Sequence, residues 1–246
     1  MKRIVFFSDV HLKTKRGKIS RLLCQLLDTL HDAEAVYILG DLFDFWIGPE
    51  QIPIMECSEI FEKIKSLADS GIKIYFLHGN RDFLLGKMEE RLLNVKIIGD
   101  AASIQIDGQK VYLTHGDLFC ENDTDYIILR HLLRFKPLQF VFKYMVPKTI
   151  KLLLARLTRW SSTELVRRKA DNTMNISSRA VKRKFEHGYD VIICGHVHKP
   201  REVLHKIQGR NCKILVLGDW KDNGSYAEYR DGLFSLKKFE EQPINT

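Results

Sequence analysis

The sequence predicts an α/β fold, and two of its features support that prediction. Short apolar runs alternate with stretches of helical periodicity in the N-terminal third, as in proteins with a partly parallel sheet. Five of the apolar runs along the chain also end at a Gly or Ser beside an Asp, Asn or His. Ligands of open α/β sheets collect at the carboxyl ends of strands, so the same residues predict one polar site.

The N-terminal third supplies three expected strands and two expected helices. Residues 4–7, 35–39 and 72–77 are the apolar runs, and the first is too short for the apolar region of a signal peptide. Residues 19–30 carry Ile and Leu at i, i+3, i+4, i+7, i+8 and i+11, which predicts a helix with one apolar stripe. A second helix is expected over 56–67, with Gly71 near its end.

In the rest of the chain, the expected strands and helices no longer alternate regularly. Residues 101–106 and 110–113 flank Asp107-Gly108, a dipeptide typical of tight hairpins. Helices are expected over 123–134, 146–160 and 163–185, a strand over 191–194, and antiparallel strands over 203–206, 213–217, 227–229 and 233–237. We therefore expect one domain, 1–246, interrupted by a helical insertion over 124–170 that caps the site.

The cysteines and the hydropathy indicate a cytoplasmic protein. The five cysteines form no CxxC pair and are odd in number, which argues against a disulfide framework and against a cysteine zinc site. No uncharged apolar run approaches the roughly 20 residues that a membrane-spanning helix needs.

The net charge of +8 is concentrated in one segment. Residues 126–163 contain no Asp or Glu but eight bases, and the rest of the chain is balanced. The eight bases are Arg130, Arg134, Lys136, Lys143, Lys148, Lys151, Arg156 and Arg159. Because the segment is also rich in aliphatic and aromatic residues, it indicates an anionic lipid surface or an amphipathic anionic ligand rather than a nucleic acid. The alternative is a basic helical hairpin that only packs on the core.

Five motifs at the strand ends carry the expected chemistry. They are Asp9-x-His11, Gly40-Asp41, Gly79-Asn80-x-Asp82, His115-Gly116-Asp117 and Gly195-His196-x-His198. Residues two apart share a face of extended backbone, so Asp9 with His11 and His196 with His198 can each reach one point. A mixture of oxygen and imidazole ligands suits Mn, Fe or Zn.

In order and spacing, the motifs resemble the calcineurin-like metallophosphoesterase family. The resemblance spans Asp9 to His198 and implies a four-layer α/β/β/α sandwich. It also implies a site for two divalent metal ions, and we expect Mn2+. Asp9, His11, Asp41 and His198 would hold one ion, and Asp41, Asn80, His115 and His196 the other, with Asp41 shared. A metal-activated water would be the nucleophile, so no Ser or Cys is required.

A finer resemblance suggests the substrate. Most of the family has Gly-Asn-His where this chain has Gly79-Asn80-Arg81, which replaces a titratable imidazole by a permanent phosphate clamp. In having Gly-Asn-Arg at this position, the chain resembles the members of the family that act in lipid A biosynthesis. Those members cleave the pyrophosphate bond of UDP-2,3-diacylglucosamine to UMP and 2,3-diacylglucosamine 1-phosphate. The basic, apolar insertion would suit a lipid-linked UDP-sugar, and we expect peripheral attachment to the cytoplasmic face of the bacterial inner membrane.

Further residue roles follow from that resemblance. Catalysis is assigned to Asp41, Asn80, Arg81, His115 and His196, and substrate binding to Asn80, Arg81, Asp123, Arg159, Ser162, Lys169 and His196. Independently of the resemblance, Asp44, Asp82, Asp117 and Asp219 are expected to orient ligands, Trp46 and Trp220 to pack, and His78 to be structural within a strand.

Alternatives remain within and outside enzymes. The chain could be a two-metal pyrophosphatase or phosphodiesterase of the same superfamily that acts on another nucleotide or lipid diphosphate. A nuclease is disfavoured because the chain outside the insertion is charge-neutral. A non-enzymatic scaffold is disfavoured because all seven metal ligands are present. Nothing in the sequence demands a dimer, so a monomer is expected.

Overall fold

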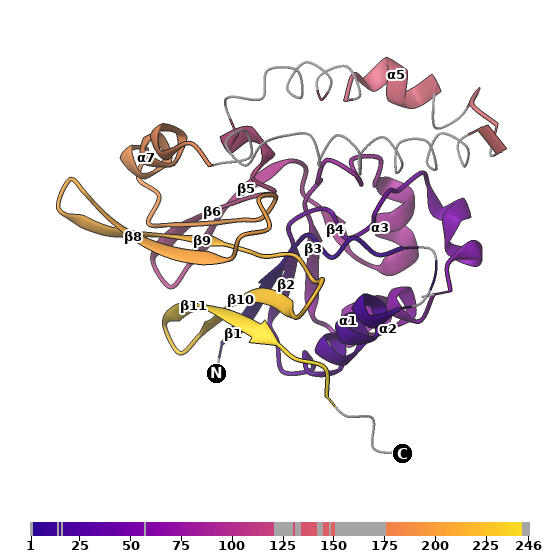
Figure 1. Cartoon of the computed structure of the whole chain (residues 1–246), viewed down its shortest axis with the longest axis horizontal. Helices are drawn as coiled ribbons and strands as arrows, with labels where there is room; N and C mark the ends of the chain where they lie inside the picture. Colours follow the sequence, from indigo (N-terminus) through magenta and orange to yellow (C-terminus); the bar gives the residue numbers. More distant parts are fainter. Residues whose placement is uncertain are drawn as a thin grey trace.

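Two β-sheets face each other in the computed structural model of the chain, and helices cover the outer face of each sheet (Figure 1). The structure describes residues 2–13, 15, 17–56, 58–120, 130, 134–141, 145–147, 149–150 and 176–242. The predicted α/β/β/α sandwich is therefore confirmed, while most of the predicted insertion over 124–170 lies outside the described residues.

The first sheet has six strands in the order β11-β10-β1-β2-β3-β4. In chain order they are β1 (Arg3–Phe7), β2 (Ala35–Ile38), β3 (Lys73–Phe76), β4 (Lys96–Ile97), β10 (Gly224–Arg230) and β11 (Leu233–Phe239). Strands β1 to β4 run parallel, and β10 joins β1 antiparallel. The carboxyl ends of β1, β2 and β3 therefore meet at one edge of this sheet.

The second sheet has five strands in the order β5-β6-β7-β9-β8. They are β5 (Ala101–Ile106), β6 (Gln109–Thr114), β7 (Val191–Cys194), β8 (Arg201–Ile207) and β9 (Arg210–Val216). The predicted hairpin joins β5 to β6, and its Asp107 and Gly108 both have positive φ, as its tight turn requires. Strand β9 corrects one expectation, because it pairs parallel with β7 as well as antiparallel with β8.

The alternation of side chains along the strands explains the layers. Val5 and Phe7 of β1 pack among the helices, whereas Ile4 and Phe6 pack between the sheets. This alternation buries both faces of the strand, so its sequence is uniformly apolar rather than alternating. The same pattern recurs in β7, where Ile193 lies between the sheets and Ile192 under the outer helix.

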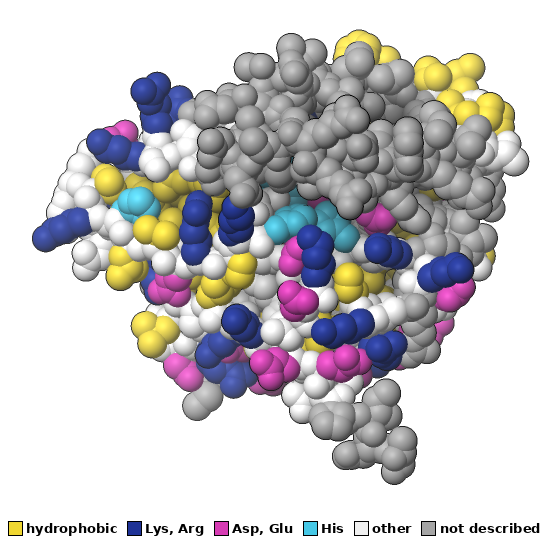
Figure 2. Space-filling model, in the orientation of Figure 1, with side chains coloured by type: hydrophobic (Ala, Val, Ile, Leu, Met, Phe, Trp, Pro, Cys, Tyr) yellow, Lys and Arg dark blue, Asp and Glu magenta, His cyan; other side chains and the backbone are white. Residues whose placement is uncertain are grey.

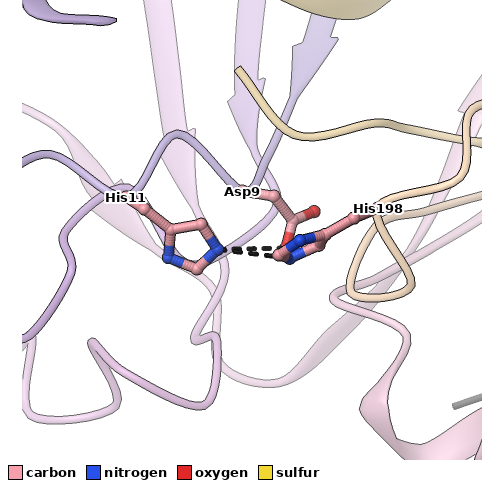
Figure 3. A group of neighbouring side chains, drawn as sticks. All are labelled: Asp9, His11 and His198. Atoms are coloured by element: carbon pink, nitrogen blue, oxygen red, sulfur yellow. Dashed lines mark hydrogen bonds and ion pairs between the residues drawn. The ribbon is translucent and has the colours of Figure 1, made fainter. Parts of the chain in front are cut away.

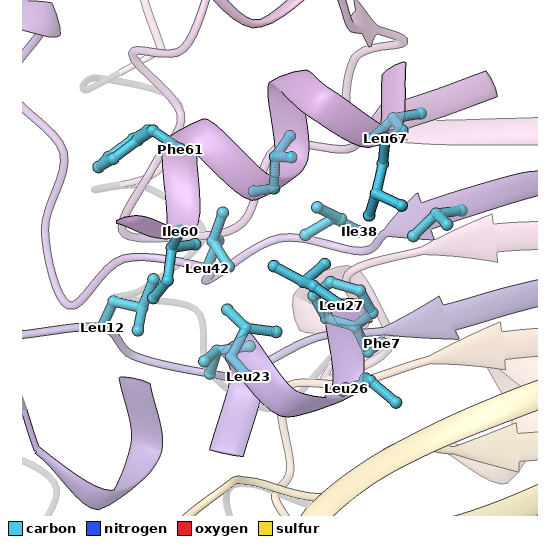
Figure 4. Packing of buried hydrophobic residues seen from close by; sticks show 14 of the residues in the cluster. Phe7, Leu12, Leu23, Leu26, Leu27, Ile38, Leu42, Ile60, Phe61 and Leu67 are labelled. Carbon is cyan, nitrogen blue, oxygen red and sulfur yellow. The ribbon is translucent and has the colours of Figure 1, made fainter. Parts of the chain in front are cut away.

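Helices complete the outer layers. The first sheet is covered by α1 (Lys18–Asp28), α2 (Ser58–Asp69) and α3 (Lys87–Leu93), and Figure 4 shows Leu26 and Phe61 among the residues that form this contact. The second sheet is covered by α7 (Ser178–Glu186), whose Phe185 is fully buried. The remaining described helices are α5 (Lys136–Phe140) and the 3₁₀ turns η1 (Pro49–Ile54) and η2 (Asp117–Phe119). None of the helices in the described part of the chain is long and apolar enough to cross a membrane.

Candidate metal centre

The five predicted motifs lie together at the edge where the two sheets meet. The first sheet contributes the loops after β1, β2 and β3, and the second contributes the loops after β6 and β7. The sequence predicted that these loops converge at one site, and the structure shows that they come from two sheets. The strand ends still meet, because the two sheets pack face to face.

Asp9, His11 and His198 form the first cluster (Figure 3). The Nε2 atoms of the two histidines are 3.2 Å apart, and Nε2 of His198 lies 3.3 Å from Oδ1 of Asp9. Nε2 of His11 lies 4.0 Å from the same oxygen. The three side chains converge from β1 and β7, and the carboxylate is fully buried.

Asp41, His115 and His196 form the adjacent cluster. Nε2 of His115 lies 3.7 Å from Oδ2 of Asp41 and 3.3 Å from Nδ1 of His196. Oδ2 of Asp41 is also 3.9 Å from Nε2 of His11, which belongs to the first cluster. The Asp41 carboxylate therefore lies between the two clusters, where a shared ligand must lie.

Asn80 completes the second cluster. Its side-chain amide lies against both carboxylate oxygens of Asp41, and the orientation with NH2 toward them donates hydrogen bonds to that carboxylate. Asn80 therefore lies beside the carboxylate that the two clusters share, within reach of the second cluster.

The backbone of the ligands is unusual. Asp9, His11, Asp41, His196 and His198 all have positive φ, between 53° and 73°, in the left-handed region that residues other than glycine rarely adopt. Such conformations cost free energy and persist where the surrounding structure imposes them, which is characteristic of functional sites. Five of the seven predicted ligands share this conformation, and among the other described non-glycine residues Asn94, Asp107, Gln208 and Asp231 also adopt it.

Glycines allow the loops to come this close. A Cβ on Gly195 would overlap Oδ2 of Asp9 and Oγ of Ser8, and a Cβ on Gly79 would overlap the Asp41 carboxylate. Gly40, with φ +84°, packs directly against the backbone of Gly79. These glycines are needed for close approach of backbone to side chain, and Gly40 also supplies a positive φ just after β2.

Contacts with a carbonyl oxygen and a carboxylate fix the orientation of two of the predicted ligand histidines. Nδ1 of His115 lies 3.0 Å from the carbonyl oxygen of Leu39, so Nδ1 carries the proton and Nε2 keeps its lone pair for the site. Nδ1 of His198 lies 3.5 Å from Oδ2 of Asp219, which leaves Nε2 pointing toward Asp9. A carboxylate or carbonyl behind a histidine is the usual support of a metal ligand.

Burial and the neighbouring carboxylates shift the pKa values of the acids and imidazoles of the site in different directions. Burial raises the pKa of Asp41 to about 7, and the neighbouring Asp82 and Asp9 add to this effect. Burial lowers the pKa of His11 to about 3 and that of His196 to about 4, so both imidazoles are neutral at neutral pH, as metal ligands must be. Burial also opposes the charge on His198, but Asp219 and Asp9 outweigh it and raise its pKa to about 9.

Two buried atoms of the first cluster also lack the partners that buried polar atoms normally have. Within the described residues, Oδ1 of Asp9 and Nδ1 of His11 make no hydrogen bond. A buried carboxylate oxygen without a hydrogen bond is costly, and a divalent cation beside Asp9 would remove that cost. The mixed carboxylate and imidazole donors and the buried atoms without a hydrogen bond together fit divalent metal ions.

Arg81 lies at the edge of the centre. Its Nη1 donates to Oδ1 of Asp44 at 3.1 Å, and its Nε lies 3.7 Å from Oδ2 of Asp41. Its backbone N–H donates to Oδ1 of Asp41 at 3.0 Å. The guanidinium is thus oriented by Asp44 next to the bridging carboxylate, with about a fifth of its side chain exposed.

The site is accessible from one side. The side chains of His11 and His198 are 16% and 29% exposed, whereas those of Asp9 and His115 are fully buried. Figure 2 shows histidine side chains gathered at the surface in the middle of one face, with Lys and Arg side chains close by. A charged ligand can therefore reach the imidazole side of the centre.

The other predicted residues have varied outcomes. Asp219 supports a ligand as expected, while Asp82 accepts hydrogen bonds from the backbone of Leu42 and Gly79 and so holds two of the loops. Trp46 and Trp220 are buried and pack in the helix-covered core, as predicted. His78 corrects an expectation, because β3 ends at Phe76 and His78 lies in the loop that follows. Asp123, Arg159, Ser162 and Lys169 lie outside the described residues.

Two of the eight bases of the 126–163 segment also depart from the expectation. Arg130 and Arg134 do not add to an open basic surface but make ion pairs with Asp100, and Arg130 pairs with Asp117 as well. Sequence reasoning missed Asp100 because it belongs to none of the five motifs. The only available signal was the Gly-Asp pair at 99–100 directly before a strand.

Comparison with known proteins agrees with this geometry. The family model for calcineurin-like phosphoesterases matches residues 2–200. The chain belongs to the calcineurin-like phosphoesterase family, whose members are metal-dependent hydrolases.

Three relatives are similar to this chain over most of its length. A protein of Pseudomonas putida is 35% identical over 241 residues, which cover 96% of this chain and 99% of the relative. A protein of Ectopseudomonas mendocina is 36% identical over 242 residues, covering 98% and 99%, and one of Pseudomonas aeruginosa is 37% identical over 223 residues, covering 90% and 92%. All three are named UDP-2,3-diacylglucosamine hydrolase.

Proposed function

We propose that the chain hydrolyses the pyrophosphate bond of UDP-2,3-diacylglucosamine, giving UMP and 2,3-diacylglucosamine 1-phosphate for lipid A biosynthesis. The observation that carries this proposal is the resemblance, over nearly the whole chain, to relatives that bear the name of this activity. The clusters around Asp9 and Asp41 support it, because they offer the ligands that phosphoester hydrolysis by metal ions requires.

The proposed centre holds two Mn2+ ions. Asp9, His11, Asp41 and His198 would bind one, and Asp41, Asn80, His115 and His196 the other. When bound, such ions supply an activated water and neutralise charge on the phosphoryl oxygens. The mixed oxygen and imidazole donors suit Mn2+ better than Ca2+, which takes oxygen ligands only.

The residues around the ions have separate tasks. Arg81, held by Asp44, would contact the phosphoryl oxygens as charge develops on them. Its guanidinium stays charged throughout, so it can stabilise an oxyanion but cannot deliver a proton to the leaving group. His196 and Asn80 would contribute to substrate binding in addition to their ligand role, and Asp123, Arg159, Ser162 and Lys169 remain predicted substrate contacts.

The same proposal includes peripheral attachment to the inner membrane. Phe135, Phe140, Val141, Met145 and Ile150 are all exposed apolar residues of the segment that carries the basic cluster. Exposed apolar side chains interspersed with bases suit the surface of anionic lipids. Sedimentation with anionic vesicles tests this, because binding at low salt that is lost at high salt is expected. An equal lack of binding at all salt concentrations would contradict it.

Release of UMP tests the enzymatic proposal. The purified chain with Mn2+ should release UMP from UDP-2,3-diacylglucosamine, and the Asp41→Ala variant should lose this activity. Metal-dependent cleavage of a generic aryl phosphodiester without cleavage of the lipid would retain the family chemistry and refute the substrate. Rapid cleavage of soluble nucleotide diphosphates would point to the same conclusion.

A further inference from the structure

Asp100 connects two of the loops that carry metal ligands, although it lies in neither of them. It follows Gly99 directly before β5, and its side chain is 38% exposed. Oδ2 accepts a hydrogen bond from Nη2 of Arg130 at 2.8 Å. Oδ1 accepts one from Nη1 of Arg134 and lies 3.3 Å from Nδ1 of His78. One carboxylate thus contacts two guanidinium groups and an imidazole.

Each arginine has a second contact that leads into the metal centre. Nη2 of Arg134 donates to the carbonyl oxygen of Gly79 at 2.7 Å, and that carbonyl belongs to the peptide bond that leads into Asn80. Nε of Arg130 donates to Oδ2 of Asp117 at 2.7 Å, two residues after His115. Asn80 and His115 are both proposed ligands of the second metal ion.

The two arginines and Asp117 are also largely removed from solvent. The side chains of Arg130, Arg134 and Asp117 are 9%, 12% and 3% exposed. The guanidinium of Arg134 further lies over the ring of Phe83 at 5.9 Å, which adds an attractive contact. Ion pairs at such low exposure are geometrically demanding, because an unpaired buried charge is costly. The cluster therefore fixes the positions of its members.

We propose that Asp100, Arg130 and Arg134 are positioning residues for the second metal ion. They hold the loop of Asn80 and the loop of His115 at a fixed separation, through the contacts of Arg134 with Gly79 and of Arg130 with Asp117. This inference rests on the proposed function, since it concerns the affinity of the proposed metal centre.

Mn2+ binding to the purified chain, measured by calorimetry or by the electron paramagnetic resonance signal of free Mn2+, tests the proposal. Wild type should bind two ions. Arg134→Gln and Asp100→Asn should each weaken one of the two by about tenfold or more, the usual effect of removing a group that supports a ligand. Arg134→Lys keeps the positive charge but cannot donate to Asp100 and Gly79 through two arms of one guanidinium. The Mn2+ affinity of this variant should therefore lie between those of Arg134→Gln and wild type.

Arg210→Gln is the matched control. Arg210 also bridges a carboxylate and a backbone carbonyl, donating to Oδ1 of Asp190 at 2.8 Å and to the oxygen of Phe185 at 2.6 Å, but none of these groups belongs to the metal loops. The Arg210→Gln variant should bind both ions as wild type does, even if thermal unfolding shows that it loses as much stability as Arg134→Gln. Saturating Mn2+ should restore the turnover of Arg134→Gln toward wild type.

The outcomes separate this inference from the function on which it rests. If wild type and Arg134→Gln bind two ions equally well, the positioning role is refuted and the metal centre stands. The positioning role is likewise refuted if Arg210→Gln weakens binding as much as Arg134→Gln does. If wild type binds no Mn2+ while Asp41→Ala behaves identically, the proposed metal centre itself is refuted.

Discussion

Gly195 offers a sharp test of the metal centre, because a single added methyl group should disturb a ligand without removing it. In Gly195→Ala the new Cβ would overlap Oδ2 of Asp9 and Oγ of Ser8. That carboxylate oxygen already accepts hydrogen bonds from Oγ of Ser8 at 2.5 Å and from the backbone N–H of His196 at 2.9 Å. Neither Asp9 nor Gly195 can move easily, because the backbone N–H of Gly195 also donates a hydrogen bond to the carbonyl oxygen of His115 at 2.7 Å.

The magnitude follows from the cost of such overpacking. Inserting a methyl group into a closely packed site costs about 1–3 kcal/mol. If that cost falls on the position of the Asp9 carboxylate, Mn2+ affinity should weaken by about five- to 150-fold, since 1.4 kcal/mol corresponds to a factor of ten. Calorimetric titration with Mn2+ measures this effect, and thermal unfolding without metal shows whether the chain still folds.

A second glycine provides the control. Gly17 precedes α1, has no positive φ, and a Cβ there would meet no atom within 4 Å. Gly17→Ala should therefore bind Mn2+ as wild type does. The reasoning is wrong if Gly195→Ala folds and binds Mn2+ within about twofold of wild type, because the methyl group would then fit without moving Asp9.

Four further perturbations probe other parts of the molecule. Asp219→Asn removes the carboxylate behind His198 and should weaken Mn2+ binding about tenfold by the same titration; unchanged binding would show that His198 needs no support. Arg81→Ala should lower kcat/KM for UMP release about a hundredfold, with Arg81→Lys recovering part of it, and wild-type turnover in both would exclude the arginine from the reaction. His78, Arg134 and Arg130 outweigh burial and hold the pKa of Asp100 well below its usual range, so its stabilising effect is present above the unfolded pKa near 4 and disappears as the pH falls below it. Urea unfolding from pH 7 to pH 3 should therefore show a steeper loss of stability for wild type than for Asp100→Asn, and equal slopes would contradict this. Leu26→Ala should lower the free energy of unfolding by about 2–5 kcal/mol, and a loss under about 1 kcal/mol would mean that this part of the core repacks around the cavity.

The ligand set was predictable from sequence because its signal is local. Each motif places Asp, Asn or His directly after an apolar run, and a strand end fixes where such a side chain goes. The structure brings together all seven predicted ligands for this reason, from Asp9 to His198. The strands β5, β6 and β7 were likewise predictable from their turn residues and β-branched apolar runs.

Other features depend on contacts between distant residues and could not be predicted in this way. The division of the loops between two sheets depends on the pairing of β1 with β10, which are more than 200 residues apart. The ion pairs of Arg130 and Arg134 with Asp100 require a tertiary structure to be recognised, because a basic run in sequence shows only its charge. Strand β4 has two residues, too few for any periodicity. Helix α3 was missed although Glu89, whose side chain accepts from the N–H of Gly86, marks its start.

The division of the ligands between two sheets also bears on how the molecule withstands heat. Asp9, His11, Asp41 and Asn80 follow strands of the first sheet, and His115, His196 and His198 follow strands of the second. The apolar filling between the sheets stops just before this edge, at residues such as Leu39 and Leu77. Metal ions bound there would link the two sheets at the edge that the apolar core does not fill. Metal at a hundred times its dissociation constant would then add about 2.7 kcal/mol to the free energy of unfolding. A chelator would thus lower the melting temperature and abolish hydrolysis over the same range of metal concentration.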